Sequence, residues 1–585
     1  MPFPSVRRSA ALRAALRSVG ALALAACALP AAAQHAGHGA FRGEPPLPAP
    51  RLSGIGTGHL PIATESETAQ AFFDQGINLL HCFWDYEAYR AFKTAIAADP
   101  EAAMPYWGLF LSLNYNQAEH LAERREALAR AVELAPKASD RERRYVQALA
   151  RLNELPGQAG RTAFIREMEA LAAAYPDDLE AKLFLAKFLL TETGGYLTEA
   201  EARTGGPRTA IARAKEILRP LLAAHPDSVG VNHYWVHAHE YDRDPTPALA
   251  AAERLPELAP GSGHILHMPG HVYFKLGEHA KARRSFLVAH AFDRAYLERY
   301  DVSPIDHWNY VHNLDYLVAN AAESGRLDEG LEWAREVQAL AVPGERLDAA
   351  GAGFILYGGQ TSPARLYLRY GAFDRAAESL EELLGRPSFA EGRAGDYHRG
   401  MLHYARGMNL ARRGEVESAV ASFQELVALN RRLAAEDAEL GSDWYYDASR
   451  RVLAIQELEL GGTLLSVGGR HEEAIAQLAR AVAEEERLGY WEPPHVARPA
   501  LESLAEAQMR AQRWEDARAT YRRELEVRPK SGHAWFGIAN TWVSEGDEAR
   551  AAEAMRRLLE VWSEADDDLP HVVSTRRWLA EHAGG

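Results

Sequence analysis

Histidines with matching spacing are the residues of this chain whose types and positions best suit chemistry. His233 and His237 lie four residues apart, and His267 and His271 repeat that spacing 34 residues further on. Residues three, four and seven apart share one face of a helix, so His264 joins the face of His267 and His271. Neutral imidazole nitrogens bind zinc, copper, nickel and iron(II). We therefore predict that two neighbouring helices gather these imidazoles around a metal ion or a polar ligand.

A third helix extends the predicted cluster. When Gly330 is aligned with Ala282, His312 falls level with His264, and Asp315 falls level with His267. Adjacent helices pack about 8–10 Å apart, so their imidazoles can share an ion at bonds of about 2.0–2.1 Å. This set exceeds the ligands of one closed zinc site and predicts one ion with spare groups, or two ions. The predicted metal ligands are His233, His237, His264, His267, His271, His312 and Asp315.

Three alternatives to simple metal binding remain open. Glu240, three residues after His237, is a candidate general base for a hydrolytic or oxidative enzyme that uses an ion with an open coordination position. Alternatively, the protein is a metal-free scaffold of the cell envelope that docks a protein or peptide in a groove lined by the same histidines. The histidines could also serve packing alone, by forming hydrogen bonds between helices in a polar core. The sequence contains no phosphate loop, Gly-x-Ser-x-Gly, His-Glu-x-x-His or Cys-x-x-Cys-His motif, so an enzyme would have to use the histidines.

A recurring pattern predicts the helices that hold these residues. A small residue is followed twelve positions later by Ala and, four beyond that, by an apolar residue. Small residues let two antiparallel helices approach closely, and the apolar side chain fills the space beside them. The pattern predicts an all-α protein built from antiparallel helix pairs. It appears as Gly76–Ala88–Phe92, Gly270–Ala282–Phe286, Gly407–Ala419–Phe423 and Gly462–Ala474–Leu478.

This pattern resembles the tetratricopeptide repeat (TPR) family, most clearly at Gly270-x-x-Tyr273, Trp535-x-x-Ile538-Ala539 and Asp99-Pro100. The family's period is 34 residues. The resemblance covers most of the chain from about residue 65, and it implies a right-handed superhelical solenoid whose first helices line a concave, ligand-binding groove. The His-Met-Pro-Gly-His segment also resembles a group of exported bacterial repeat proteins without an established common function.

The chain divides into five predicted parts. Residues 34–61 are rich in Gly, Pro and Ala and predict a flexible leader after a signal peptide at residues 1–33. Residues 62–340 predict an N-terminal solenoid with the histidine-lined groove, and residues 363–585 predict a C-terminal solenoid. Residues 341–362 contain five glycines and predict a connector between the two.

The N-terminus has the features of an export signal. A basic region with Arg7 and Arg8 precedes a short apolar run over residues 19–29, and Ala31–Ala33 offers a cleavage site. The segment Leu24–Cys27 also resembles a lipobox, which would attach a lipid to Cys27. We therefore expect a periplasmic or exported protein, with a lipid anchor at Cys27 as the alternative to a soluble form.

Charge and cysteine content narrow the partners. The net charge is −16, and it becomes −20 when residues 1–33, with four arginines and no acid, are removed. Such a charge excludes nucleic acid and adsorption on anionic lipid, and favours a metal ion and an envelope protein or peptide as partners. With two cysteines, the chain cannot form two disulfides, and we expect Cys82 to be a buried apolar residue.

Overall fold

The computed structural model describes residues 47–582 except 114–117, 195, 199–200, 202–207, 344–349, 387–390, 441–443 and 490. The expected signal peptide at residues 1–33, with Cys27, and the leader residues 34–46 lie outside the described residues.

Every regular element in the described part of the chain is a helix, which confirms the all-α prediction. The N-terminal helices are α2 (Glu67–His81), α3 (Asp85–Ala98), α4 (Ala103–Ser112), α5 (Ala118–Leu134), α6 (Asp140–Glu154), α7 (Gly157–Ala174), α8 (Leu179–Thr191) and α10 (Thr209–Ala224). The central helices are α11 (Val229–His239), α12 (Leu249–Leu258), α13 (Gly263–Lys275), α14 (His279–Tyr300), α15 (Trp308–Ser324) and α16 (Leu327–Gln338).

The C-terminal half continues in the same way. Its helices are α17 (Ala350–Gly353), α18 (Ser362–Arg369), α19 (Phe373–Leu384), α21 (Gly392–Arg412), α22 (Val416–Leu440), α23 (Trp444–Val467), α24 (His471–Leu488), α25 (Ala500–Arg510), α26 (Trp514–Val527), α27 (Gly532–Glu545), α28 (Glu548–Val561) and α29 (Pro570–Glu581). The π-helix η7 (Phe354–Gly359) follows α17, and short 3₁₀ turns are η3 (Ala135–Lys137), η4 (Thr246–Ala248) and η5 (Pro304–Asp306).

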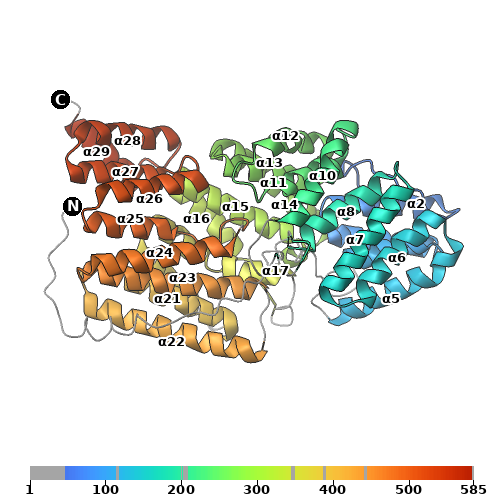
Figure 1. The fold of residues 1–585 in the computed structure, drawn as a ribbon, viewed down its shortest axis with the longest axis horizontal. Coiled ribbons are helices and arrows are strands. Elements are labelled where there is room, and N and C mark those ends of the chain that lie inside the picture. The colour runs from blue at the N-terminus through green and yellow to red at the C-terminus, as the bar shows by residue number, and fades with distance from the viewer. Residues whose placement is uncertain are drawn as a thin grey trace.

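Helices that follow one another along the chain pack as pairs. The pairs α11–α12, α13–α14 and α15–α16 stand in sequence order, and α13 contacts both α11 and α15 (Figure 1). The histidine-bearing helices are thus the first helices of three successive pairs, as the spacing predicts. The right-handed sense of the superhelix remains a prediction.

Glycines set the close approach within the pairs. A Cβ atom added at Gly270 would lie 2.2 Å from the ring of Phe286, so only glycine leaves space for that ring. This is the contact that the repeat pattern predicts. At Gly407 the expected partner Phe423 is replaced by Leu460 of α23, which would lie 2.4 Å from an added Cβ. The pattern therefore predicts the close approach at Gly407 correctly, but the observed neighbour is Leu460 and the predicted one is Phe423.

Part of the predicted leader is packed rather than flexible. Within residues 47–61, Ile55 and Leu60 are buried. The Gly58 backbone donates to the side-chain oxygen of Asn78 on α2 and accepts from its nitrogen, both at 2.8 Å. Because Asn78 satisfies backbone groups that a helix would satisfy internally, this segment is ordered without any periodic sequence pattern.

The predicted glycine-rich connector is also part of the core. Within residues 341–362, Ile355 and Tyr357 of η7 are buried, in the same apolar cluster that extends from Ala49 to Ala507. A Cβ atom at Gly353 would lie 3.3 Å from Tyr445, so the glycine serves close packing. The two predicted solenoids therefore share one core, and residues 350–359 of this segment are helical.

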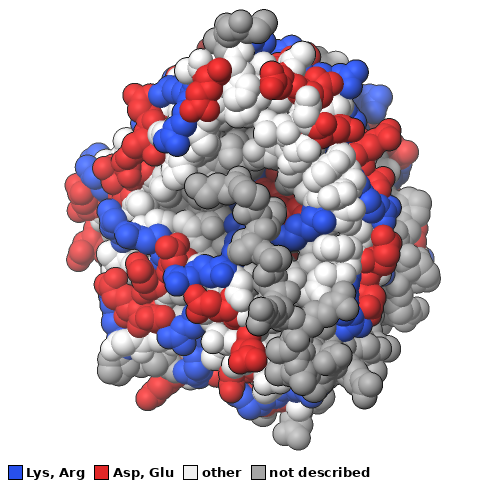
Figure 2. All heavy atoms as spheres, turned by 90° about the vertical axis from the view of Figure 1, so that its left-hand side faces the viewer, with Lys and Arg blue, Asp and Glu red and all other residues white. Residues whose placement is uncertain are grey.

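The core buries Cys82, and charged side chains lie on the surface. Cys82 is fully buried, as expected, and burial raises the pKa of its thiol to about 12. Figure 2 shows acidic and basic side chains interspersed over one face of the molecule. Among the described helices, none has the length and apolar character needed to cross a bilayer.

Candidate metal centre

The two central histidine helices begin at equivalent residues. The side chain of Ser228 caps α11 by accepting from the backbone of Val231, and Ser262 caps α13 in the same way. The two serines are 34 residues apart, like the histidines that follow them. The shared starting point fixes the register that places the imidazoles of α11 beside those of α13.

A first triad of imidazoles forms between these helices. It consists of His233 and His237 from α11 and His264 from α13, and one nitrogen of each ring lies within 4.8 Å of the others. The Nε2 atom of His233 is 2.8 Å from Nε2 of His237 and 3.0 Å from Nε2 of His264. The three Nε2 atoms therefore converge on one point.

The opposite nitrogens of the first triad face acceptors. Nδ1 of His233 lies 2.6 Å from the backbone carbonyl oxygen of His81. Nδ1 of His237 lies 2.6 Å from a carboxylate oxygen of Glu240. A carbonyl can only accept, so Nδ1 of His233 carries the proton and its Nε2 carries a lone pair. The negative charge of Glu240 beside Nδ1 of His237 favours the same tautomer there.

The third ring is held in the same tautomer. Nδ1 of His264 lies 3.0 Å from the side-chain oxygen of Asn309 on α15. The Asn309 nitrogen donates to Asp293 at 2.6 Å, which fixes the orientation of the amide. Its oxygen thus accepts from Nδ1 of His264, and Nε2 of His264 also presents a lone pair.

A second triad lies between α13 and α15. It consists of His267, His271 and His312, and again one nitrogen of each ring lies within 4.8 Å of the others. Nε2 of His267 directly faces Nε2 of His271. The His312 ring centroid is 5.0 Å from that of His267 and 5.5 Å from that of His271.

Two rings of the second triad are oriented as in the first. Nδ1 of His267 lies 2.7 Å from the oxygen of Asn313, whose nitrogen donates to the carbonyl of Phe286 at 2.9 Å. Nδ1 of His271 lies 3.0 Å from a carboxylate oxygen of Glu492. Their Nε2 atoms therefore face each other without a proton.

This arrangement fits a metal ion. Unprotonated nitrogens at 2.8–3.0 Å repel one another unless a cation lies between them. Around a tetrahedral zinc ion, two nitrogens bonded at about 2.05 Å are about 3.3 Å apart, so shifts of a few tenths of an ångström admit the ion. Acceptors behind each ligating ring are also a general feature of histidine metal sites.

Burial keeps the imidazoles in the ligand form. Burial, followed by the neighbouring imidazoles, lowers the pKa of His233 and of His267 well below the usual range. Both rings are therefore neutral near pH 7, which is the form that binds metal.

The two triads adjoin each other and share one carboxylate. The ring centroids of His264 and His267, one from each triad, are 6.0 Å apart. The same oxygen of Glu240 lies 2.6 Å from Nδ1 of His237 and 3.6 Å from Nδ1 of His271. Glu240 therefore lies behind both ligand sets.

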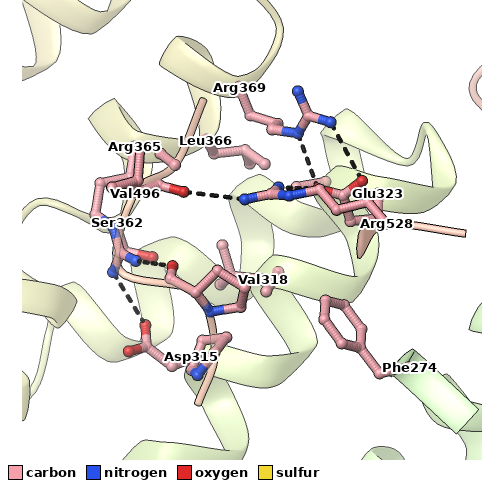
Figure 3. A pocket seen from close by; sticks show the side chains of 15 residues that line it. Phe274, Asp315, Val318, Glu323, Ser362, Arg365, Leu366, Arg369, Val496 and Arg528 are labelled. Atoms are coloured by element: carbon pink, nitrogen blue, oxygen red, sulfur yellow. Dashed lines mark hydrogen bonds and ion pairs between the residues drawn. The ribbon is translucent and has the colours of Figure 1, made fainter. Parts of the chain in front are cut away.

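Asp315 does not join the histidines. It lies three residues after His312 on α15 and faces Arg365 of α18, with 3.8 Å between a carboxylate oxygen and a guanidinium nitrogen (Figure 3). The predicted alignment with His267 therefore does not bring Asp315 into either triad. His239 stacks on Trp235 with ring centroids 4.4 Å apart and also belongs to neither triad.

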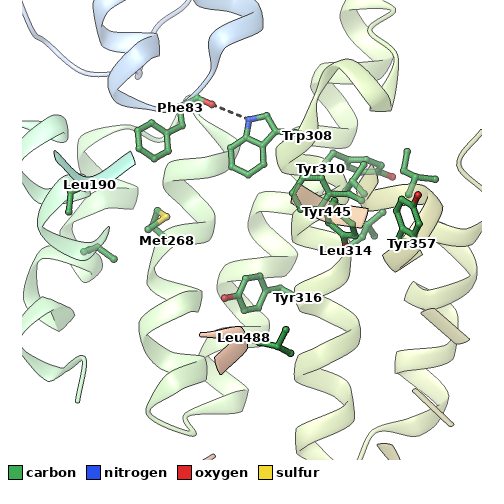
Figure 4. Packing of buried hydrophobic residues seen from close by; sticks show 14 of the residues in the cluster. Phe83, Leu190, Met268, Trp308, Tyr310, Leu314, Tyr316, Tyr357, Tyr445 and Leu488 are labelled. Carbon is green, nitrogen blue, oxygen red and sulfur yellow. Dashed lines mark hydrogen bonds between the residues drawn. The ribbon is translucent and has the colours of Figure 1, made fainter. Parts of the chain in front are cut away.

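The predicted open groove is also wrong for these residues, because all six ligand histidines are no more than 4% exposed. An aromatic ring covers each triad. Phe83, at a left-handed φ of 52°, packs 4.7 Å from the ring of His233 and 4.9 Å from that of His237. Tyr316 packs 4.5 Å from His271 and 5.2 Å from His312, and Figure 4 shows both aromatic residues.

Several contributors escape sequence reasoning. Asn309 and Asn313 lie four residues apart on the helix that carries His312. A search for residues that orient histidine rings can use this helical spacing as a signal. Glu492 gives no such signal, because it lies 221 residues from His271 along the chain. His81 contributes only its backbone carbonyl, which no side-chain pattern reveals.

Comparisons with known proteins add little to this geometry. No protein-family model matches the chain, and no curated protein matches it in sequence. One similar solved structure is Naa15/Naa10 bound to HypK-THB, with 12% identity over 89% of this chain and 92% of that chain, and a TM-score of 0.23. Another is the TPR domain of P58(IPK), with 13% identity over 70% of this chain and 100% of that chain, and a TM-score of 0.19. Similarity at this level assigns no function.

Proposed function

We propose that this protein binds two transition-metal ions, one in each buried histidine triad of its TPR-like helical scaffold. The observation that carries the proposal is the convergence of Nε2 atoms whose opposite nitrogens donate to fixed acceptors in His233 and His264 and lie beside a carboxylate in His237. A purely structural histidine cluster would instead alternate donors and acceptors, so that each N–H faced a lone pair. Here the lone pairs face one another.

The ligand chemistry favours zinc or copper. Imidazole nitrogens suit both metals, and a set of three imidazoles leaves a further coordination position for water or another ligand. No sulfur or carboxylate oxygen belongs to either histidine triad within the described residues. The acidic groups Glu240 and Glu492 instead hold the rings from behind and help offset the positive charge of the ions.

Metal analysis of the purified full chain tests this proposal. We expect about two ions per chain in the wild type, because there are two triads. His233→Ala and His267→Ala should each retain one ion, and the double variant should retain none. His239→Ala is the matched control, since His239 is a buried histidine of α11 outside both triads. Equal metal content in the wild type and the double variant would refute the proposal.

We also propose that the protein acts outside the cytoplasm, where it meets a metal ion and an envelope protein or peptide. This proposal rests on the signal-like residues 1–33 and on the acidic net charge of the remaining chain. Mass spectrometry of the mature N-terminus distinguishes the two processing routes. Cleavage after Ala33 gives a soluble form, whereas a lipidated Cys27 at the first position gives an anchored form.

A further inference from the structure

A cleft lies beside the second triad. It has a volume of about 400 Å³, which is the size of a small-molecule site. Its wall is formed by residues of α13, α14, α15, α24, α25 and α26 and of the segments that follow α11, α24 and α26. Tyr316 and Leu488, which Figure 4 shows close together, both belong to its wall. The cleft thus brings the C-terminal half of the chain against the histidine helices.

One ring separates this cleft from the second triad. Tyr316 lines the cleft and also contacts all three imidazoles, with ring centroids 5.3 Å from His267, 4.5 Å from His271 and 5.2 Å from His312. Tyr316 is only 2% exposed, so it fills the passage between the two spaces. A rotation of this single side chain would connect the cleft to an ion in the second triad.

The first triad meets the cleft only through a residue behind one of its rings. Glu240 lines the cleft and lies 2.6 Å from Nδ1 of His237, whereas the covering ring, Phe83, and the three histidines do not line it. Phe83 is itself fixed from behind, because its carbonyl oxygen accepts from the indole of Trp308 at 3.3 Å. The two triads therefore differ in access, although their ligand sets are alike.

The cleft wall defines the chemistry of an occupant. Phe274, Leu488 and Trp491 present apolar surface. Arg528 of the wall pairs with Glu323 at 2.6 Å, Arg243 pairs with Glu526 at 3.2 Å, and Lys275 donates to the backbone carbonyl oxygens of Glu240 and Asp242. The wall also carries several carboxylates, so it disfavours an anionic ligand, and its apolar side chains fit an apolar body.

We propose that this cleft admits a small molecule with an apolar body and a nitrogen or oxygen head group that binds the ion of the second triad, while the first triad stays closed. This inference rests on the proposed metal binding. It assigns the two sites different roles, with exchange of ligands only at the second. Tyr316 is the positioning residue that controls passage between the cleft and the ion.

Cobalt(II) and 4-phenylimidazole provide a direct test with the full chain. Cobalt absorbs visible light, and its bands shift when a new ligand binds. We expect 4-phenylimidazole to shift the bands and to bind about tenfold more tightly than imidazole, because its phenyl ring is buried in the cleft. His233→Ala should retain the shift, because the second triad is intact. His312→Ala should retain cobalt in the first triad and lose the shift.

Two tryptophan substitutions locate the binding path. Val527 lines the cleft and is 59% exposed, so Val527→Trp narrows the cleft without disturbing the core. It should weaken 4-phenylimidazole binding about tenfold and leave the cobalt content unchanged. Val288→Trp is the control, because Val288 is 54% exposed on α14 and lies outside the cleft wall.

The outcomes separate this inference from the metal proposal. Failure of the wild type to bind cobalt overturns both. Normal cobalt binding with an unchanged spectrum in 4-phenylimidazole overturns only the cleft inference. The cleft inference is also overturned if the spectral shift disappears in His233→Ala but persists in His312→Ala. Calorimetry that finds equal affinity of the metal-free and metal-loaded protein for 4-phenylimidazole would overturn it too. Circular dichroism of each variant verifies that the helices are formed.

Discussion

At the scale of single residues, the orientation of each ring matters more than the number of histidines. The Nδ1 proton of His233 is fixed by a carbonyl and that of His264 by an amide oxygen, and a carboxylate lies beside Nδ1 of His237. Three different kinds of neighbour thus favour the same tautomer. The common result, an unprotonated Nε2 directed inward, is what a metal ligand requires.

Glu240 should affect both sites, because its carboxylate lies behind one ligand of each triad. We predict that Glu240→Gln lowers metal affinity about 10–100-fold at both sites, as expected for the loss of a ring-orienting carboxylate. Titration against a chromophoric chelator measures both affinities. Glu492→Gln is the matched comparison, since Glu492 lies 3.0 Å from Nδ1 of His271, a ligand of the second triad, and it should weaken that site alone. An effect of Glu240→Gln confined to one site would contradict the shared role.

At the scale of elements, pairs of helices hold the triads through a few close contacts. The ring of Phe286 on α14 fits against Gly270 of α13 and packs 4.9 Å from the ring of His267. One contact between two helices therefore supports both the hairpin and a predicted ligand. The strap at residues 47–61 performs a similar task for α2, whose last residue His81 offers its carbonyl to His233.

We predict that Gly270→Ala destabilises the protein by about 1–3 kcal/mol, because the added methyl group overlaps the ring of Phe286. Urea unfolding followed by circular dichroism measures the loss. In the Phe286→Leu background the smaller side chain leaves space, so the same alanine should cost less there. Equal costs in both backgrounds would show that the clash does not determine the effect.

We also predict that Asn78→Ala releases the strap. Asn78 pairs with both backbone groups of Gly58, and their loss leaves part-buried polar atoms unsatisfied at a cost of about 1–3 kcal/mol. Limited proteolysis should then cut within residues 47–61 faster than in the wild type. An unchanged cleavage rate would mean that apolar burial of Ile55 and Leu60 alone holds the strap.

At the scale of the whole molecule, one apolar core and one buried ionic network join the two halves. Arg369 of α18 contacts Glu323 of α15 and Glu502 of α25, and Figure 3 shows its pairing with Glu323. Glu524 of α26 lies 3.5 Å from the same guanidinium and is fully buried. Distant segments of the chain thus meet around one cation beside the cleft.

This network predicts a dependence of stability on pH. Burial, followed by the charge of Glu502, raises the pKa of Glu524 to about 8. The folded state then holds a proton that the unfolded state has released, so this group's contribution to stability falls as pH rises from about 4.5 to about 8. Glu524→Gln mimics the protonated form, and its stability relative to wild type should increase over that window. Thermal unfolding at pH 5 and pH 8 measures the stability difference between Glu524→Gln and the wild type. A stability difference that does not change with pH would contradict the raised pKa of Glu524.

The sequence predicts local features well and distant ones poorly. The six histidines are found because helical spacing and a 34-residue register depend only on nearby residues. Glu492 and Arg365 come from the other half of the chain, so neither the support for His271 nor the diversion of Asp315 can be read from spacing. The burial of the triads likewise depends on Phe83, which lies between α2 and α3, and on Tyr316 of α15.

X-ray absorption spectroscopy of the zinc- or copper-loaded full chain tests the central claim most directly. Two sites of three imidazoles predict a metal environment dominated by histidine nitrogens at about 2.0–2.1 Å, with the outer-ring scattering of imidazole. The double variant His233→Ala/His267→Ala should lose this signal. A spectrum with oxygen ligands alone, or an imidazole signal that persists in the double variant, would contradict metal binding by the two triads.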